Sequence, residues 1–235
     1  MRIITGKARG MKLRTLEGLT TRPTSEAAKE ITLQAIVEYS SDKYATGTFT
    51  FSILKYASKV SDNAEKALIY DVLSYVRAAY YYFGTNDFNA IAEIDEIIGS
   101  DYDNSSVPSD SLPDELPTEG LVGATFNLTA TPAVRFYIAD GYRAEDFAFF
   151  INGEKKAVTK GSDSSGEYVE LNLYAYEMCE LISCEFGGRP IGGYSIASYR
   201  AWASTNGSDS LIRLAERFQK YAESARDYKT AYTDN

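Results

Sequence analysis

The chain has 235 residues, of which 44% are hydrophobic and 24% charged, an ordinary globular composition with enough length for a sizeable core. It contains no histidine, which excludes Ser-His-Asp triads, histidine general bases and histidine-ligated metals. Residues 1–30 hold seven Lys/Arg and three Glu, a charge of +4, so residues 31–235 carry −13 within the net charge of −9. The acidic part is expected to repel nucleic-acid phosphates.

The first fifty residues predict a hairpin followed by a helix. The glycine-punctuated stretch 2–15 is expected to pair as a basic hairpin. Residues 25–40, "SEAAKEITLQAIVEYS", place apolar residues at helical spacing after a proline, and Thr24 or Ser25 can cap this helix. From Tyr44 the residues alternate as in a strand, and the pattern becomes helical near Ser52.

Two further helices are predicted before residue 100. The first covers 66–83, ends at Gly84 and is apolar nearly all round, so it is expected to be buried. A shorter, acidic helix is predicted over 88–99. Residues 100–119 contain three prolines among many acidic and polar residues, which predicts a linker without regular structure.

After the linker the hydrophobic period changes to two. The pattern predicts six strands, over 121–130, 133–139, 147–153, 154–160, 166–173 and 180–188. "NGEK" is expected to form a tight hairpin turn and "GSDSSG" another, and the cluster "FGGRPIGGY" is interpreted as a turn leading out of the β-region. Short strands at this spacing predict a small antiparallel sandwich, which an amphipathic helix over 210–232 follows.

A repeat connects the two helical parts. "FSILKYASK" at 51–59 resembles "YSIASYRAW" at 194–202, and its Ser, Ile and Tyr are identical at an offset of 143. Each copy precedes a polar loop and a long helix. After a three-residue adjustment the long helices align Leu68, Tyr75, Ala79 and Tyr82 with Leu214, Tyr221, Ala225 and Tyr228. We expect the two helical hairpins to bury their apolar faces against each other; chance similarity of helical patterns is the alternative.

Several residue patterns have both a chemical and a structural interpretation. Ser52 and Lys55 have the Ser-x-x-Lys spacing of acyl-serine enzymes, but the companion motifs are absent. Solvated surface is expected, rather than glycosidase chemistry, for the acidic pairs Asp95/Glu96, Asp114/Glu115 and Glu145/Asp146. A calcium loop would need a glycine and a closing glutamate that do not follow Asp101, Asp103 and Asn104. No metal site is therefore predicted.

The cysteines, the aromatic residues and the apolar runs give three further expectations. Cys179 and Cys184 are five apart, on opposite faces if they share a strand, so buried free thiols are expected rather than a disulfide. Core packing and stacking on sugar rings are the alternatives for Tyr80, Tyr81, Tyr82 and Trp202. No run approaches the about 18 apolar residues of a membrane span. The N-terminus has no apolar signal region, so the chain as written is expected in the cytosol.

The opening stretches "MRIITGKARGMKL" and "TRPTSEAAKE" resemble the start of bacterial 16S rRNA guanine-N2 methyltransferases. In that family the segment is a basic, RNA-facing element before a Rossmann-like catalytic domain, which implies RNA contacts by Arg2, Lys7, Arg9, Lys12 and Arg14. A loosely packed basic tail is the alternative. The glycine-rich cofactor loop and the Asp/Asn-Pro-Pro-Tyr signature of that family are absent. We therefore expect no S-adenosylmethionine site, no other cofactor and no catalytic residue.

From about residue 45 onward the chain resembles a module of secreted, multidomain surface proteins from Firmicutes that has no known catalytic signature. The matching stretches include "FSILKYASKV", "VLSYVRAAYYYFG", "FFINGEKKAV" and "YSIASYRAW". This resemblance implies a β-sandwich flanked by paired helices, displayed outside the cell, with a glycan or a surface protein as partner. The two resemblances imply different compartments. A chimeric or truncated product explains the disagreement, and a natural protein with a new N-terminus is the alternative.

Together these patterns predict an α+β fold, with a small antiparallel β-sandwich flanked by two similar helical hairpins and no Rossmann-like methyltransferase domain. The expected parts are a basic segment, a helical region with the first hairpin, an acidic linker, the sandwich and the second hairpin, over 1–30, 31–99, 100–119, 120–190 and 191–235. The preferred function is that of a non-enzymatic structural or binding module. The alternative is an rRNA (guanine-N2) methyltransferase or a catalytically dead relic of one.

Overall fold

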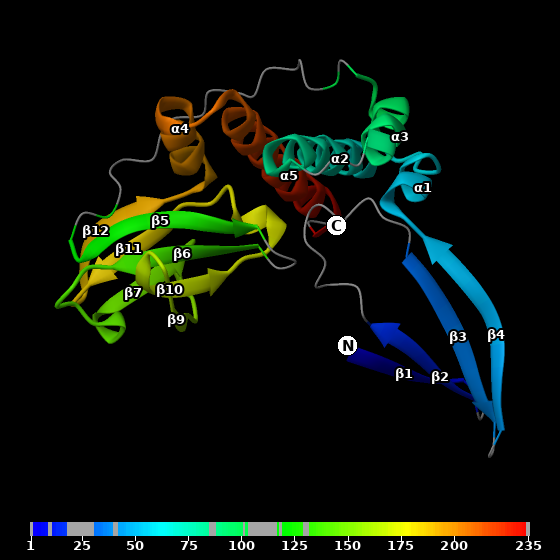
Figure 1. Ribbon diagram of the computed structural model, residues 1–235. Coiled ribbons are helices and arrows are strands. Elements are labelled where there is room, and N and C mark those ends of the chain that lie inside the picture. Colours follow the sequence, from blue (N-terminus) through cyan, green and yellow to red (C-terminus); the bar gives the residue numbers. More distant parts are fainter. Residues whose placement is uncertain are drawn as a thin grey trace.

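The computed structural model describes residues 2–8, 11–17, 31–39, 42–84, 88–100, 102, 117, 119–128 and 132–233, with side chains from Ser52 to Tyr232. Figure 1 shows three parts: an N-terminal sheet, a group of helices, and a β-sandwich formed by the second half of the chain. The last strand of the N-terminal sheet leads directly into the helices, and the helices adjoin the sandwich.

The N-terminal sheet is antiparallel and has the strand order β1-β2-β3-β4, formed by Arg2–Ala8, Met11–Glu17, Ile31–Tyr39 and Asp42–Phe51. The pairing of β1 with β2 confirms the predicted hairpin. The helix predicted over 25–40 is wrong in its described part, because β3 pairs with β4 along its whole length. "ITLQAIVEY" is rich in β-branched residues, which lose freedom in helices and suit strands, so cross-strand pairing overrides the helical spacing.

Three helices follow the sheet: α1 (Ile53–Ala57), α2 (Asn63–Phe83) and α3 (Phe88–Ile98). They confirm the helical patterns predicted from Ser52 onward. Asp62 caps α2 by accepting a hydrogen bond from the Glu65 amide at 2.9 Å, and Gly84 ends it at a φ of 64°. The three helices share a buried apolar cluster of Leu54, Ala57, Ile69, Leu73, Val76, Tyr80, Ile91, Ile94 and Ile98. The predicted linker lies largely outside the described residues.

The second half of the chain is a sandwich of two four-stranded antiparallel sheets, with the orders β5-β6-β10-β9 and β12-β11-β7-β8. The strands are β5 (Leu121–Leu128), β6 (Pro132–Ile138), β7 (Phe147–Ile151), β8 (Glu154–Lys155), β9 (Thr159–Asp163), β10 (Gly166–Asn172), β11 (Ile182–Phe186) and β12 (Arg189–Tyr194). Phe136 and Phe149, one from each sheet, are buried and stack with centroids 4.7 Å apart. The sandwich confirms the predicted α+β class.

The described part of the chain contains no Rossmann-like topology. Every strand pairing in it is antiparallel, whereas a doubly wound nucleotide-binding sheet is mostly parallel. The two-residue turn at Asn152 and Gly153, with φ of 52° and 78°, confirms the predicted hairpin between β7 and β8. Both positions need a positive φ, which explains the Asn-Gly pair.

Two details of the β-region differ from the prediction. The stretch 154–160 is not one strand. After β8 the chain leaves the sandwich sheet that contains β7, and with β9 it enters the sandwich sheet that contains β10. The glycine cluster is a turn only at Gly187 and Gly188, and the following residues pair with β11 as strand β12. Glycine-rich segments have little strand propensity of their own, so the pairing with β11 decides this conformation.

Two helices complete the chain: α4 (Ile196–Asn206) and α5 (Asp209–Thr233). The second confirms the amphipathic helix predicted over 210–232. Phe218 of α5 meets Phe126 of β5 edge-on at 5.3 Å, which joins the helix to the sandwich core. α2 lies beside α5 and contributes Tyr75, Ala78 and Ala79 to the same core. Because its other side belongs to the cluster with α1 and α3, α2 is buried on two sides, as its apolar pattern predicts.

The helix starts agree with the predicted repeat. Ser52 and Ser195 stand before α1 and α4, at the predicted offset of 143. Asp62 and Ser208 stand before α2 and α5, 146 residues apart, and each side chain accepts a hydrogen bond from the backbone amide three residues on. The loop adjustment inferred from the sequence therefore coincides with equivalent helix caps.

The two hairpins pack against each other through α2 and α5, as predicted. Tyr75 and Tyr221, which are aligned in the repeat, stack with centroids 5.9 Å apart. Burial and then the neighbouring hydroxyl of Tyr82 raise the pKa of Tyr199. At the equivalent place the pKa of Tyr56 is raised, first by its hydrogen bond to Glu65 and also by nearby Tyr228. Equivalent residues of the two hairpins thus have equivalent neighbours, in agreement with the predicted repeat.

Candidate binding surface

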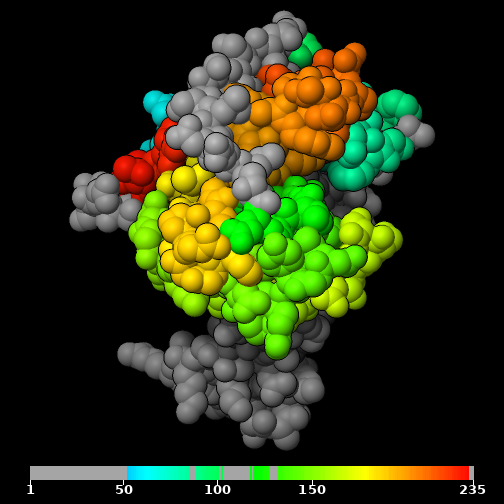
Figure 2. Space-filling view, turned by 90° about the vertical axis from the view of Figure 1, so that its left-hand side faces the viewer, coloured from blue at the N-terminus to red at the C-terminus, as the bar shows by residue number. Residues whose placement is uncertain are grey.

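Aromatic side chains at the end of α2 and on α4 form a partly exposed surface, in which the Tyr82 hydroxyl lies near Tyr199. It consists of Tyr82, Phe83, Tyr199 and Trp202, and we call it the aromatic patch. Trp202 stacks on Tyr199 at 6.1 Å, and Tyr82 meets Phe83 edge-on at 5.0 Å. The exposed fractions of Trp202 and Phe83 are 51% and 58%. Figure 2 shows α4 and the start of α5 as an orange surface on this side of the molecule.

The sandwich holds α4 in place, which gives the aromatic patch a defined geometry. The backbone amide of Ile196 donates to the carbonyl oxygen of Met178 at 3.2 Å, and the Tyr199 ring lies edge-on to Phe126 of β5 at 5.9 Å. One side of Tyr199 therefore belongs to the core, while Trp202 carries the patch into solvent. Core packing and stacking on sugar rings were the predicted alternatives for these aromatic residues. Tyr80 is a core residue at 1% exposure, whereas Tyr81 is exposed at 53%.

The equivalent surface at the other end of the helix pair has a different character. It is formed by Tyr56, Tyr228 and Tyr232, the last two with ring centroids 4.6 Å apart. Lys59 stands at the position that matches Trp202, and Lys229 at the position that matches Phe83. The Lys229 ammonium lies 3.6 Å from the centroid of the Tyr176 ring. The aromatic patch therefore marks a place where the duplicated halves have diverged.

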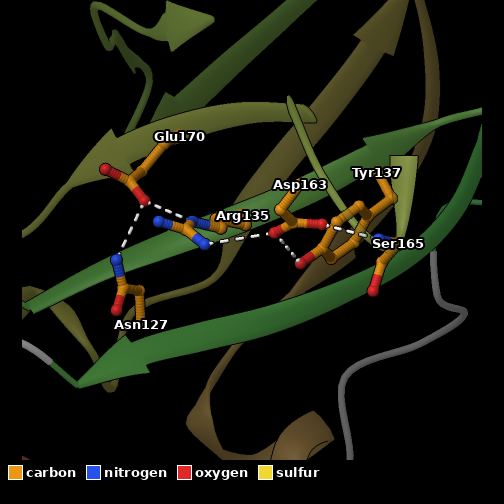
Figure 3. A network of polar contacts seen from close by, with 6 residues as sticks. All are labelled: Asn127, Arg135, Tyr137, Asp163, Ser165 and Glu170. Carbon is orange, nitrogen blue, oxygen red and sulfur yellow. Dashed lines mark hydrogen bonds and ion pairs between the residues drawn. The ribbon is translucent and has the colours of Figure 1, made fainter. Parts of the chain in front are cut away.

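In the sandwich, the outer face of the sheet β5-β6-β10-β9 carries a connected polar network (Figure 3). Arg135 of β6 is at its centre, with Nε 2.5 Å from Oε2 of Glu170 and Nη1 3.3 Å from Oδ2 of Asp163. The hydrogen bond to Glu170 raises the pKa of Arg135. The remaining members donate to these two carboxylates and are Asn127, Tyr137 and the Ser165 amide. Because its charges are paired, we interpret the network as a connection between β6, β9 and β10.

Two polar clefts open beside α5. The larger has a volume of about 500 Å³ and lies between α5, the β7–β8 turn and a short 3₁₀ helix at Ala175–Glu177. Within it Lys156 binds Glu177 at 2.9 Å and Glu154 at 3.1 Å, and the hydrogen bond to Glu177 is the main reason that its pKa is raised. The smaller cleft, of about 330 Å³, lies between α2, α5 and the end of α3 and is lined by three arginines.

Ser52, the serine of the Ser-x-x-Lys pattern, has a local structural role. Its Oγ accepts a hydrogen bond from the backbone amide of Lys55 at 3.1 Å, and the residue is 4% exposed. This contact caps α1. Equivalent Ser195 stands at the start of α4, so the serine belongs to the helix-start signal of the repeat.

In each described acidic pair, one carboxylate forms an ion pair with a basic residue. Asp95 binds Arg77, and Glu145 binds Lys160. The pair Asp114/Glu115 and the calcium-type residues Asp101, Asp103 and Asn104 lie outside the described residues. Among the residues that are described, no group of three or more His, Cys, Asp and Glu side chains is arranged to hold a metal ion.

The two cysteines do not form a disulfide, as predicted, but only one of the two predicted buried thiols is buried. Cys184 is 1% exposed inside the sandwich, and burial raises the pKa of its thiol to about 12. Cys179 is half-buried and lies in the turn before β11. The two residues therefore do not share a strand, and the argument from opposite strand faces is wrong although its conclusion holds.

The basic residues predicted to contact RNA belong to the first hairpin. Arg2 and Lys7 lie in β1 and Lys12 and Arg14 in β2, whereas Arg9 is outside the described residues. The pairing register sets Lys7 opposite Lys12 and Thr5 opposite Arg14. Directly paired positions share a face of an antiparallel sheet, so positions 7, 12 and 14 lie on one face.

Residues 1–53 match the family model described as Conserved hypothetical protein 95, a family of rRNA methyltransferase-like proteins. The match covers β1 to β4 and reaches the start of α1. No curated protein and no solved structure matches the chain. The N-terminal resemblance thus extends beyond residue 30, and the resemblance to surface-protein modules finds no support in these comparisons. No helix within the described ranges is both long and apolar enough to cross a membrane.

Proposed function

We propose that the helices and the sandwich form a non-enzymatic binding module of the kind displayed at cell surfaces, with the aromatic patch as its contact surface. The observation that carries this proposal is the stacked Trp202–Tyr199 pair, half-exposed on a helix that the sandwich holds in place. Rigid aromatic rings bury a large area on binding and lose little conformational entropy, so clusters of exposed rings are typical of recognition surfaces.

A glycan is the partner that fits this surface best. A pyranose ring has an apolar face of C–H groups and a polar edge of hydroxyls. The indole face of Trp202 offers an apolar plane, and the neighbouring Tyr82 and Tyr199 carry both rings and hydroxyls. The second surface has lysines in place of two of these rings, which makes it a natural internal control.

The chain itself provides the probe for this proposal, because Trp202 is its single tryptophan. We expect chitohexaose, cellohexaose or xylohexaose to change its fluorescence saturably and to shift the emission to the blue as the indole leaves water. Trp202→Ala should abolish binding in calorimetry, whereas Tyr232→Ala on the second surface should retain it. The absence of a saturable change with all three sugars would overturn a glycan function, and so would equal loss in the two variants.

One observation favours a second function, S-adenosylmethionine-dependent rRNA (guanine-N2) methyl transfer or a relic of it. This observation is the family match over residues 1–53. A cofactor that binds the folded state raises the melting temperature by mass action. A rise of several degrees with millimolar S-adenosylmethionine would replace the binding-module proposal, and an unchanged melting temperature would remove the alternative.

A further inference from the structure

The larger cleft beside α5 has walls of opposite charge. On one side α5 contributes Arg226 and Lys229. The other side comes from the β7–β8 turn and the segment after β10, and its acidic residues are Glu154, Glu177 and Glu180. Lys156 lies on this second side, where Glu154 and Glu177 bind it. A cationic wall and a largely acidic wall therefore line one volume of about 500 Å³.

Contacts beside the cleft hold its two walls in place. Glu177 uses both carboxylate oxygens: Oε1 accepts a hydrogen bond from Lys156 at 2.9 Å, and Oε2 accepts one from the Tyr174 amide at 2.9 Å. The α5 wall is attached through Lys229, whose ammonium group lies 3.6 Å from the centroid of the Tyr176 ring. Lys156 and Glu177 are therefore structural parts of the cleft, and these contacts help to set the spacing of its walls.

Two charged groups that line the cleft, those of Arg226 and Glu180, face each other's wall without forming a pair. Within the described residues, the carboxylate next to the Arg226 guanidinium is that of Asp227, and its distance of 3.9 Å from Nε is too long for a hydrogen bond. The Glu180 carboxylate has neither an ion pair nor a hydrogen bond to any part of the described chain. The Arg226 side chain is 44% exposed, and Glu180 is half-buried.

We infer that the larger cleft binds a small zwitterion, namely an amino acid or a short peptide with a free ammonium and a free carboxylate group. The planar fork of Arg226 can bind both oxygens of the ligand carboxylate, and the Glu180 carboxylate can accept hydrogen bonds from its ammonium group. Such pairs are stronger in a cleft that partly excludes water than on an open surface. A simple anion or a simple cation would satisfy one wall only, so the charges of the cleft favour a ligand that carries both.

The size of the cleft agrees with this class of ligand, because small-molecule sites commonly measure about 300–1,000 Å³. Asn152, at the exposed β7–β8 turn, also lines the cleft. Its side-chain amide can donate to and accept from a peptide group between the two charged ends. The cleft shares no residue with the aromatic patch, and the inference does not depend on the glycan proposal.

Calorimetric titration of the full chain tests the need for both charges, with glycine, diglycine and triglycine as ligands. N-acetyldiglycine lacks the ammonium group, and diglycine amide lacks the carboxylate. We expect saturable binding of at least one zwitterion, and binding about tenfold weaker for both blocked compounds. Tightest binding of glycine would identify a free amino acid as the ligand, and tightest binding of a longer compound would identify a peptide. The absence of saturable binding by all three zwitterions, or equally tight binding of a blocked compound, would overturn the inference.

Arg226→Gln and Glu180→Gln test the placement of the site, and each should weaken binding about tenfold. Arg213→Gln is the matched control for the arginine, because it makes the same change in charge on the same helix at the smaller cleft. Glu167→Gln, at a different cleft of the sandwich, is the control for the glutamate. Trp202→Ala should leave peptide binding unchanged, so a failure of the glycan proposal can be told apart from a failure of this inference. Equal losses in the cleft variants and their controls would contradict the site.

Discussion

Tyr75 of α2 and Tyr221 of α5 stack with ring centroids 5.9 Å and ring planes 17° apart, and they are aligned residues of the internal repeat. Each ring therefore meets its own counterpart in the other copy. Phe218 approaches Tyr75 at 5.2 Å and Phe126 of the sandwich at 5.3 Å. The contact between the two copies is thus connected directly to the core of the sandwich.

Replacing Tyr75 by alanine should lower the free energy of unfolding by about 3 kcal/mol, because a buried ring is lost and a cavity remains. Tyr221→Ala should cost less, since that ring is partly exposed. If the rings stabilise each other, the double variant should fall short of additivity by about 1 kcal/mol. Urea unfolding of the four proteins measures this coupling, and strict additivity would contradict it.

Asp71 should make the stability depend on pH in a defined direction. It is buried between α2 and α5, where it accepts hydrogen bonds from Tyr102 at 2.9 Å and from Ser224, and burial raises its pKa above 3.8. The folded state therefore binds this proton more tightly than the unfolded state does. The stability from this group is complete below the unfolded pKa and is lost as the pH rises through the raised folded value.

Asp71→Asn removes the titration and keeps the shape. The stability of this variant relative to the original chain should increase as the pH rises from about 4 and should then level off. Urea unfolding at a series of pH values measures the difference, and a difference independent of pH would contradict the assignment. Asp71→Leu is the control for the hydrogen bonds and should cost about 2 kcal/mol, because the half-buried hydroxyls of Tyr102 and Ser224 lose their acceptor.

The two thiols should differ in reactivity. Cys179 is half-buried in a turn, whereas Cys184 is enclosed in the sandwich with its pKa raised to about 12. A thiolate is the reactive form, so an aromatic disulfide reagent should modify Cys179 readily. In the Cys179→Ser variant, reaction should proceed only as fast as the sandwich opens, and mild denaturant should accelerate it. Rapid modification of Cys184 without denaturant would contradict its placement in the core.

A chain that begins at Ser52 should retain the helices and the sandwich, because both hydrophobic clusters consist of residues between 53 and 222. Its melting temperature should stay within a few degrees of that of the full chain, as scanning calorimetry can measure. Cutting after residue 30 is less suitable, since β3 would lose its partner β2 and present a free edge. A fragment from Ser52 that shows no cooperative unfolding would contradict the independence of these parts.

The elements that the sequence predicted correctly are those with local signals. Gly84 ends α2 through its own left-handed backbone conformation, and Asn152-Gly153 needs only its own backbone angles to make a hairpin. β3 and β12 were missed because their conformation depends on β4 and β11, which supply the hydrogen bonds. The helical spacing in 25–40 predicted a helix, and the glycines of 187–193 predicted a turn. No local sequence pattern identifies the partner strand.

The candidate surfaces were predicted only in part. Tyr81, Tyr82 and Trp202 were recognised as possible ligands for sugar rings, but only the structure separates them from buried Tyr80. Neither cleft beside α5 was foreseen. For the smaller cleft a usable signal was present, since Arg77 interrupts the all-round apolar pattern of α2 and Arg217 stands beside the apolar stripe of α5. A cation in such a position must be paired or must face a cavity.

By itself the sequence determined the end of α2, the strand-rich second half and the internal repeat, because capping, turn chemistry and hydrophobic period act over a few residues. Tertiary structure alone decided that the two repeats meet at Tyr75 and Tyr221, that α2 is shared by two cores, and that Arg77 and Arg217 line one cleft. The two residue pairs are each more than a hundred positions apart in the chain. These relationships arise when separately formed faces bury each other, which no local pattern encodes.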